Sequence, residues 1–454
     1  MSVEVPTQWR SVLPHLGHEL PPDRSPETGS GEAVQANLPL ELVRQSISAR
    51  EYWPIPEPVV EAYRKFRPTP LWRATGFERA IGARVPVYLK YEGGNISGSH
   101  KLNTALAQAH YYARAGVKEL VTGTGAGQWG TALAAACALF GLRCTVFMVG
   151  SSLRRKPYRG VLMTMLGAEV HSSPTDLTRV GRDDDGNRGN SLSLAIGEAV
   201  EYARAKDGAA FSIGSGETYS ILHQSVIGME AQQQLAALEA DVDAVVGAVG
   251  AGSNFGGIAL PFHAEAAATG ARAPLLVAAE SSTTPKLTRG VYAYDRTDAT
   301  GTSPLEAMYT IGSDYVIPDS HSAGLRFHAA AKVVSAMRHA GQVEATAVSQ
   351  AEALEAGRLL TVHEATLPAP ESGHALAAAA KLATTGADDL RAERGVLVCV
   401  SGHGYLDLGA YQQFLDGELD DVAPDGGALS AAMSGLKSVP GARAGDLVGV
   451  GRPS

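Results

Sequence analysis

The fold is decided by the segment Asn95-Ile96-Ser97-Gly98-Ser99-His100-Lys101-Leu102-Asn103-Thr104-Ala105, in which a lysine stands between a Gly/Ser-rich turn and an Ala-rich stretch. Further on, the strand-like run 119–122 leads into a second glycine-rich turn, Gly123-Thr124-Gly125-Ala126-Gly127-Gln128-Trp129-Gly130. Such turns present backbone N–H groups at helix N-termini, where they bind anions. A lysine beside two anion cradles predicts a Schiff-base amine that reacts with a phosphate-bearing aldehyde, next to an amino-acid carboxylate. Ordinary exposed loops also combine Gly, Ser and Lys, so this motif needs support from the rest of the chain.

Length and composition predict a two-domain globular protein. The chain has 454 residues, of which 45% are hydrophobic and 19% charged, and this balance supports a large buried core. The 51 glycines suit a fold with many strand-to-helix turns. A net charge of −9 argues against nucleic acid or an anionic membrane as the main partner.

The cysteines and the N-terminus indicate a reducing, cytoplasmic environment. Cys137, Cys144 and Cys399 lie in apolar runs without CxxC spacing, so we expect buried thiols and no metal site. The first residues lack a basic-then-apolar signal pattern, and no apolar run is long enough for a membrane span.

Hydrophobic patterning predicts alternating strands and helices in the first half of the chain. Residues 1 to about 48 are expected to form an irregular, surface-hugging extension. The expected elements that follow are helix Leu71–Ile81, strand Val85–Lys90, helix Leu102–Ala115, strand Leu120–Thr122, helix Thr131–Phe140, strand Cys144–Val149, helix Leu153–Leu166, a strand from Gly167, a polar loop Arg182–Asn190 and helix Leu192–Lys206.

A second strand–helix series occupies the rest of the chain. Its expected elements are strand Ala244–Val249, helix Phe255–Ala268, strand Pro274–Ala279, an irregular region Ser281–Ser320, helices Leu325–His339, Gln350–His363 and Ala375–Thr384, and strand Val396–Val400. We therefore expect an α/β protein with two doubly wound parallel-sheet domains and the active site between them.

The expected segments follow from these two series. They are an N-terminal extension with the first helices (1–66), a strand and helix segment that packs with the second domain (67–99), a first α/β domain with a mobile subdomain and the Schiff-base lysine (100–215), a second α/β domain with the phosphate loop (216–416) and a poorly ordered tail (417–454).

Motifs spread over most of the chain carry a family resemblance. They include Arg67-Pro68-Thr69-Pro70-Leu71, Gly98-Ser99-His100-Lys101, Gly125-Ala126-Gly127-Gln128-Trp129-Gly130, Lys156-Pro157-Tyr158-Arg159, His223-Gln224-Ser225-Val226-Ile227-Gly228, Gly252-Ser253-Asn254-Phe255, Gly324-Leu325-Arg326, Pro368-Ala369-Pro370-Glu371-Ser372 and Ser401-Gly402-His403-Gly404. Together they resemble the β subunit of tryptophan synthase, a fold type II pyridoxal-phosphate enzyme. The resemblance is closer to the longer second type, which carries an N-terminal extension and usually works without an α partner.

The resemblance implies pyridoxal 5′-phosphate as cofactor, with Lys101 as the Schiff-base lysine and later the base at Cα. His100 would contact the phosphate, and Ser401 would face the pyridine nitrogen, which suits β-elimination and β-replacement better than transamination. Glu280 resembles a supporting acid or plays a structural role. A monovalent cation near the site is a further option. The other cofactor-binding residues would be Asn103, Gly250, Ala251, Gly252, Ser253, Asn254 and Glu371, where Ala251 replaces a usual glycine at little cost unless its φ is positive.

The substrate loop departs from the family at one position. By resemblance, the main chain of Gly123, Thr124, Gly125, Ala126, Gly127 and Gln128 would bind the substrate α-carboxylate. The family has glutamate immediately before the Thr-Gly-Ala-Gly-Gln run, and this chain has Gly123. That glutamate is assigned to helping expel the serine hydroxyl and to orienting indole. Such acid–base help is typically worth ~10²–10⁴ in rate.

Three interpretations of Gly123 stay open. The enzyme could use another leaving group or acceptor, with the vacated volume admitting a larger group. It could recruit another acid, for which Glu92, Glu217 and His403 are candidates, or it could be a silent homologue. Intact Lys101, His100, Ser253 and Ser401 favour a changed reaction over inactivity.

Two further positions bear on the pocket. The stretch 214–219 replaces a more apolar one that the resemblance leads us to expect. Glu217 and Tyr219 could therefore meet an acceptor more polar than indole, although drift in a surface loop is equally compatible. Arg326 could help close the site or form a plain surface ion pair.

The predicted function is β-elimination or β-replacement on a serine-like amino acid through an aminoacrylate, with a nucleophilic acceptor that Gly123 leaves uncertain. A genuine tryptophan synthase, joining L-serine to indole with another acid, is the alternative. A nicotinamide Rossmann enzyme is excluded because no G-x-G-x-x-G with a downstream ribose acid follows a first strand. The resemblance also suggests a homodimer.

Overall fold

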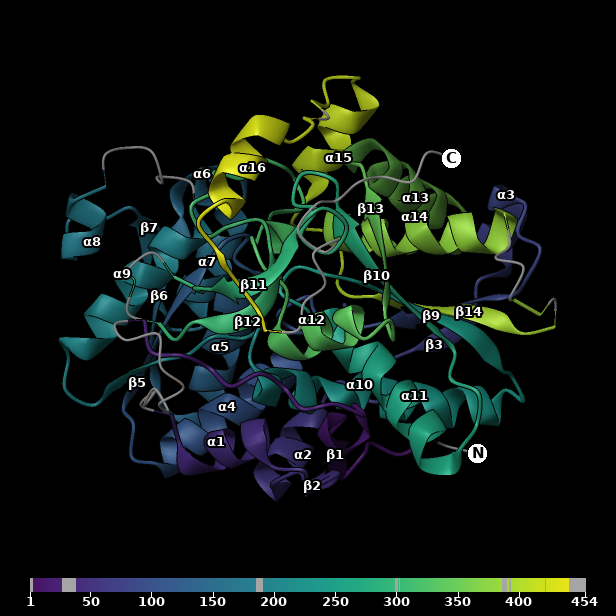
Figure 1. Cartoon of the computed structure of the whole chain (residues 1–454), viewed down its shortest axis with the longest axis horizontal. Helices are drawn as coiled ribbons and strands as arrows, with labels where there is room; N and C mark the ends of the chain where they lie inside the picture. The colour runs from purple at the N-terminus through teal and green to yellow at the C-terminus, as the bar shows by residue number, and fades with distance from the viewer. Residues whose placement is uncertain are drawn as a thin grey trace.

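A computed structural model of the protein describes residues 3–26, 38–184, 191–298, 301, 303–385, 390–391, 393–420 and 422–440. Figure 1 shows one α/β half around β5, β6 and β7 and another around β9, β10 and β14. The expected α/β class with parallel sheets is confirmed. Most of the expected polar loop 182–190 and the end of the tail lie outside the described residues.

The larger sheet has six strands and one antiparallel edge. Its order is β13 (Glu344–Val348), β10 (Leu275–Ser281), β9 (Val242–Ala248), β14 (Gly395–Val400), β4 (Val87–Tyr91) and β3 (Leu71–Arg73), and only the β3–β4 pairing is antiparallel. Every residue of the central strands β9 and β14 is buried, as a sheet covered on both faces requires. Figure 1 shows α10 (Thr218–Ala237) and α11 (Ser253–Thr269) below this sheet, and α13 (Gln350–Glu364) and α14 (Pro370–Thr385) above it.

The smaller sheet is parallel, in the order β7 (Glu169–Ser173), β6 (Arg143–Val149), β5 (Glu119–Thr124) and β8 (Ala209–Phe211). Side chains alternate across a strand with a period of two, so Val121 and position 123 face the same side of β5. On that side Val121 packs against Ala195 and Ala199 of α9 (Leu192–Arg204). The opposite face is covered by α5 (Gln128–Phe140), behind which α4 (Leu102–Arg114) packs.

Several expected elements differ from those observed. The expected helix 71–81 is a short strand, β3, followed by α3 (Thr75–Ile81), because Pro68 and Pro70 hold the chain extended. The expected helix 153–166 is two helices, α6 (Gly150–Arg155) and α7 (Pro157–Met165), because Pro157 disfavours helical geometry at Lys156. The expected helix 325–339 is only α12 (Lys332–His339), since the Ala331 N–H leaves the helical pattern and donates to the Ala251 carbonyl at 2.6 Å.

The region expected to be irregular, 281–320, contains an antiparallel pair. Strands β11 (Val291–Asp295) and β12 (Glu306–Thr310) pair from Val291 opposite Thr310 to Asp295 opposite Glu306. The alternation of Tyr292 and Tyr294 was the signal for β11. From the segment expected to be a poorly ordered tail, β15 (Lys437–Ser438) joins β11. The remaining elements of this half are η2 (Ala323–Leu325), α15 (Leu408–Leu415) and α16 (Gly426–Met433).

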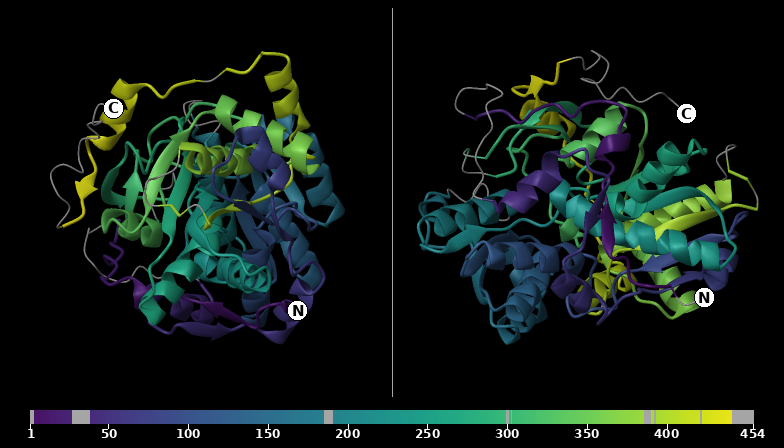
Figure 2. Two further views of the ribbon diagram at one scale, coloured as in Figure 1. Left: turned by 90° about the vertical axis from the view of Figure 1, so that its right-hand side faces the viewer. Right: turned by 90° about the horizontal axis from the view of Figure 1, so that it is seen from below.

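The N-terminal extension is more regular than expected and lies along the body. It contains β1 (Gln8–Arg10), η1 (Leu13–His15), α1 (Leu40–Ile47), β2 (Tyr52–Pro54) and α2 (Glu57–Tyr63). Trp9 is fully buried against His223 of α10, with ring centroids 4.4 Å apart. Figure 2 shows this purple segment crossing the molecule, and Arg24 pairs through its backbone with Leu305 just before β12.

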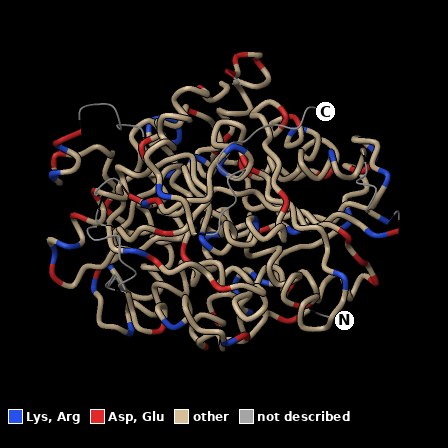
Figure 3. The backbone as a smooth tube through the Cα atoms, in the orientation of Figure 1, with Lys and Arg blue, Asp and Glu red and all other residues tan. Residues whose placement is uncertain are grey.

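The short helix α8 (Arg179–Arg182) packs beside α9. In the view of Figure 3 acidic and basic residues are interspersed over the tube. Within the described ranges, no helix combines the length and apolar character needed to cross a membrane.

Candidate active site

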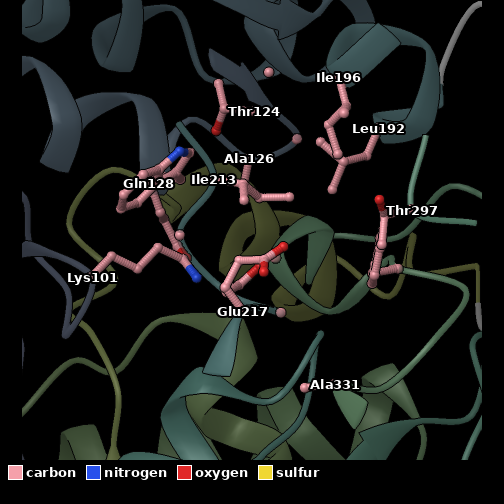
Figure 4. Close-up of a pocket in the computed structure, with 18 of the residues that line it drawn as sticks. Lys101, Thr124, Ala126, Gln128, Leu192, Ile196, Ile213, Glu217, Thr297 and Ala331 are labelled. Atoms are coloured by element: carbon pink, nitrogen blue, oxygen red, sulfur yellow. The ribbon is translucent and has the colours of Figure 1, made fainter. Parts of the chain in front are cut away.

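Residues from both halves line one cavity that contains Lys101. Its space is about 750 Å³, part of it open to solvent. The β5–α5 turn, α9 and the 213–217 loop contribute one side, and β12, η2 and Phe327 contribute the other. Figure 4 shows Lys101 and Thr297 on opposite sides of this view, with Glu217 between them. The cavity therefore offers an amine, an apolar wall and carboxyl groups within one space.

Lys101 is half-buried, and its amine has no partner among the described residues. It is the N-cap residue of α4, directly after the Gly/Ser turn. Its ammonium group has no hydrogen bond or ion pair with any residue that the structure describes. Burial lowers the pKa of Lys101 to about 8, against the opposing influence of Glu371. An amine so placed is readily deprotonated and suited to react with a carbonyl carbon.

His100 connects the lysine segment to two other loops. Its Nε2 lies 3.2 Å from Ser253 Oγ at the start of α11, and its Nδ1 lies 3.3 Å from the Ser401 carbonyl after β14. Burial and the neighbouring Lys101 hold the pKa of His100 well below its usual range, so the ring is neutral near pH 7. The three loops that the sequence singled out therefore meet at one point.

The turn before α11 has the geometry of an anion cradle. Gly252 has φ +131°, a conformation that favours glycine, and precedes the exposed N–H groups of the first turn of α11. Gly250 lies against η2, where a Cβ would meet the Gly324 carbonyl at 2.4 Å. Ala251 has no positive φ, so its replacement of glycine costs no backbone strain. The Asn254 amide donates to the Ala248 carbonyl at 3.4 Å and steadies the turn.

Ser401 and Glu371 come to the site from the C-terminal part of the chain. Ser401 Oγ is 2.8 Å from Ser372 Oγ, a neutral hydroxyl pair. Glu371 Oε1 accepts from the Gly324 N–H at 2.9 Å, and its charge acts on Lys101. Asn103 lies apart from this group, because its amide donates to Gln224 at 3.0 Å and is buried with the Arg67–Glu92 ion pair.

The β5–α5 turn presents backbone N–H groups to the cavity. Thr124, Gly125, Ala126 and Gln128 line it, and Gly127 is the N-cap of α5 with φ +86°. The first turn of a helix leaves its N–H groups unbonded, and the helix dipole favours an anion there. This arrangement suits a carboxylate.

The volume expected to be vacant at Gly123 is filled. A Cβ built on Gly123 would lie 2.6 Å from both the Ala195 carbonyl carbon and the Ile196 nitrogen. Real side chains do not approach backbone atoms so closely, so α9 occupies this space. The expectation that the missing side chain leaves room for a larger group is wrong at this position.

Comparisons with known proteins agree on the family. The profile described as "Pyridoxal-phosphate dependent enzyme" matches residues 63–402. Tryptophan synthase beta chain 2 of Thermococcus kodakarensis is 42% identical over 429 residues, 93% of this chain and 96% of that one. Tryptophan synthase beta chain 2 of Aeropyrum pernix is 44% identical over 432 residues, 93% and 96% of the two chains. The chain belongs to the tryptophan synthase β family of pyridoxal-phosphate enzymes.

Solved structures support the fold of this family more widely. An L-serine ammonia-lyase from Rhizomucor miehei superposes with a TM-score of 0.58 at 17% identity, covering 77% of this chain and 98% of that one. A processed threonine deaminase isoform 2 from Solanum lycopersicum gives 0.59 at 15% identity, covering 92% and 99%. At these identities the likeness concerns the fold alone.

The residues present fit the family's cofactor. An unpartnered amine at Lys101, a neutral His100 and the cradle before α11 are what an aldehyde with a phosphate group requires. Ser401 offers a hydroxyl rather than a carboxylate. Among the described residues no three His, Cys, Asp or Glu side chains are grouped to hold a metal ion.

Three residues were considered as replacements for the acid missing at Gly123, and two of them lie away from the cavity. Glu92 is fully buried and paired with Arg67 at 2.9 Å. His403 packs on the turn at Gly98, accepts from the Tyr405 N–H at 3.2 Å and does not line the cavity. Glu217 does line it.

Three other residues singled out from the sequence have structural contacts. Tyr219 is buried beside His223 and lies outside the cavity lining. Glu280 accepts hydrogen bonds from the backbone of residues 287 and 288 at 2.8 and 2.9 Å. Arg326 is buried and paired with Asp319 at 2.5 Å.

Sequence reasoning missed Glu306, which lines the cavity at the first position of β12. It was hidden in the region expected to be irregular. Residues 306–310, Glu-Ala-Met-Tyr-Thr, show no two-residue alternation that could have placed it.

Proposed function

We propose that the protein catalyses β-elimination or β-replacement on a serine-like amino acid, with an acceptor or leaving group that differs from the pair used by tryptophan synthases. The carrying observation is the unpartnered Lys101 amine in one cavity with the Thr124–Gln128 cradle. Family membership supports the cofactor, and the substrate class rests on the cradle.

Each group at the site has a proposed role. The bound cofactor supplies an electron sink for the Cα carbanion. Lys101 Nζ holds the cofactor and later accepts the α-proton, for which a pKa of about 8 is suited near neutrality. The β5–α5 turn binds the α-carboxylate, and the cradle before α11 with His100 binds the phosphate. Ser401 would donate a hydrogen bond to the ring nitrogen, and a neutral hydroxyl there does not hold the ring protonated.

A changed acceptor is supported by what surrounds Gly123. The backbone of α9 fills the position where the family's glutamate would begin, so no carboxyl can act from there. Two other carboxyl groups, Glu217 and Glu306, line the same cavity. An apolar acceptor such as indole would have to be buried against them at a cost in desolvation.

Tryptophan synthesis from L-serine and indole is the second candidate. It is favoured by the names of the curated relatives and by Glu217, which lies in the cavity and could supply the missing acid.

Absorbance spectra of the purified holoenzyme test both candidates. We expect a cofactor band that disappears in Lys101→Ala and changes on adding O-acetylserine or O-phosphoserine, which have better leaving groups than L-serine. If L-serine alone changes the cofactor band as the activated analogues do, and indole then reverses that change with formation of tryptophan, the second candidate is correct. If the wild-type protein has no cofactor band, both candidate functions are wrong. If the band is present but no amino acid alters it, the protein is a catalytically silent homologue.

The proposal includes a homodimer that works without an α partner, in the cytoplasm. We also propose that the chain divides into the five segments expected from the sequence, with boundaries after about residues 66, 99, 215 and 416. Sedimentation velocity of the purified chain tests the dimer.

A further inference from the structure

Glu217 and Glu306 reach the cavity from two different elements. Glu217 is the N-cap residue of α10, and Glu306 begins β12. Only 7% of Glu306 is exposed, and its carboxyl group accepts no hydrogen bond from any described residue. A buried carboxyl group with no hydrogen-bond donor among the described residues, in the wall of a cavity, is stabilised when a ligand supplies a donor.

Only one cationic group among the described residues lies near this pair and interacts with it. Lys332, at the start of α12, interacts with both glutamates. Asp23 of the N-terminal extension already holds Lys332 in a bidentate ion pair with two contacts of 2.9 Å. Glu217, Glu306 and Asp23 therefore share one ammonium group, so ionising both glutamates leaves a charge that a cationic ligand can neutralise.

The proton affinities agree with this geometry. Burial, and then Glu217, raise the pKa of Glu306 to about 8. Burial also raises the pKa of Glu217, with Lys332 opposing. A cationic group between the two acids would remove both penalties, because an opposite charge lowers a carboxyl pKa.

We propose that Glu217 and Glu306 form the acceptor subsite of this enzyme and that the acceptor presents a cationic nitrogen group, a protonated amine or a guanidinium, to them. The inference rests on the proposed function, since it takes the cavity beside Lys101 as the place where an acceptor binds. The apolar residues Leu192, Ile196 and Met308 in the same wall would contact the rest of the acceptor. The acceptor is thus amphipathic, with a cationic head and an apolar body.

Calorimetric titration of the holoenzyme with a matched pair of probes tests this. Benzylguanidine and benzylurea have nearly the same shape, differ in charge, and do not condense with an aldehyde as a primary amine does. We expect benzylguanidine to bind at least about tenfold more tightly than benzylurea at pH 7.5, and this preference to fall by about tenfold in Glu306→Gln and in Glu217→Gln. Glu355→Gln is the matched control, because this carboxylate is exposed and paired with Arg358 on α13.

Three outcomes would overturn the proposal. Equal binding of the two probes to the wild type would do so, as would a preference that survives when Glu217→Gln and Glu306→Gln are combined in one chain. A preference lost equally in the Glu355→Gln control would show a non-specific charge effect. Retention of the cofactor band and of the unfolding temperature checks that the variants fold. The titration needs no turnover, so its result is independent of the spectral test of the proposed function. Equal binding of the probes would contradict the acceptor subsite alone, and a missing spectral response to amino acids would contradict the proposed function alone.

Discussion

The backbone of Ala195 lies against Gly123, with the Ala195 carbonyl carbon 2.6 Å from the place where a Gly123 Cβ would be. This contact joins α9 to β5 at the rim of the cavity. It follows from the strand period, because Gly123 faces the same side as Val121, and Val121 packs on α9. The glycine therefore allows a close approach of two backbones.

Restoring a side chain at position 123 should damage the protein rather than create an acid. We expect Gly123→Ala to lower the free energy of unfolding by about 1–3 kcal/mol, because α9 would have to move away from β5. Gly123→Glu should cost at least as much and should not improve the use of L-serine. Urea unfolding monitored by circular dichroism measures the cost.

Gly216→Ala is the matched control for this glycine, because a Cβ there would make only an ordinary contact of 3.9 Å with Ala251. Equal stability of Gly123→Ala and the control would contradict the contact. A gain in L-serine turnover in Gly123→Glu would show that α9 yields easily.

The meeting of the loops at the candidate site was predictable because the loops are short and carry glycine at fixed places. The turn at Lys101, the cradle before α11 and the β5–α5 turn are local motifs, and parallel strands bring their loops to one edge. The contact between Gly123 and α9 was not predictable, since it joins segments whose approach depends on packing. Glu306 was missed for a related reason: β12 is defined by pairing with β11, and pairing between distant strands leaves a weak trace in sequence.

The Lys101 amine should weaken the cofactor-free fold. Its folded pKa of about 8 lies below the ordinary 10.5, so below pH 8 both states are protonated and folding carries the full penalty. Between pH 8 and 10.5 the unfolded chain holds the extra proton, and stability rises with pH. At pH 7 we expect cofactor-free Lys101→Met to be more stable than wild type by up to about 3 kcal/mol, with the difference shrinking toward pH 10.5. Thermal unfolding across this range measures it.

Lys286 provides the matched comparison. Burial lowers its pKa to about 8 as well, but it donates to the Val249 carbonyl at 3.1 Å and faces Glu280. Lys286→Met should therefore destabilise, because Glu280 loses its opposite charge. If both variants changed stability in the same direction, the absence of partners at Lys101 would not explain its effect.

Glu92 should prove structural and Glu217 functional. Glu92 accepts from Arg67 at 2.9 and 3.1 Å with both side chains fully buried, and removing a partner from such a pair costs about 3 kcal/mol or more. Glu92→Gln should lower stability by about that amount without changing leaving-group preference. Glu217→Gln, in which the lost carboxyl group has no hydrogen bond from a described residue, should change stability by less than about 1 kcal/mol. Chemical unfolding beside steady-state kinetics with O-acetylserine and L-serine separates them; a stable Glu92→Gln with altered preference would reverse the assignment.

Asp407 should hold the α6–α7 segment closed over the site. It is buried at the N-cap of α15 and pairs with Lys156 at 2.5 Å and Arg159 at 3.0 Å. Burial opposes ionisation, but these two cations hold the pKa of Asp407 below its usual 3.8. The pairs are therefore present above pH 4 and are lost as the pH falls through the lowered pKa.

Asp407→Asn removes this anchor at neutral pH. We expect amides of residues 150–165 to exchange about 10–100-fold faster, while the central strands β9 and β14 keep their protection, because only the local opening is made easier. Asp416→Asn is the control, since this exposed carboxylate accepts side-chain hydrogen bonds, within the described part of the chain, from Gln412 of α15 alone. Binding of a serine-like amino acid should slow exchange in the same segment of the wild type and do so less in Asp407→Asn. Unchanged exchange there in both experiments would mean that this segment does not open over the substrate, and that the two cations hold Asp407 for the stability of the fold alone.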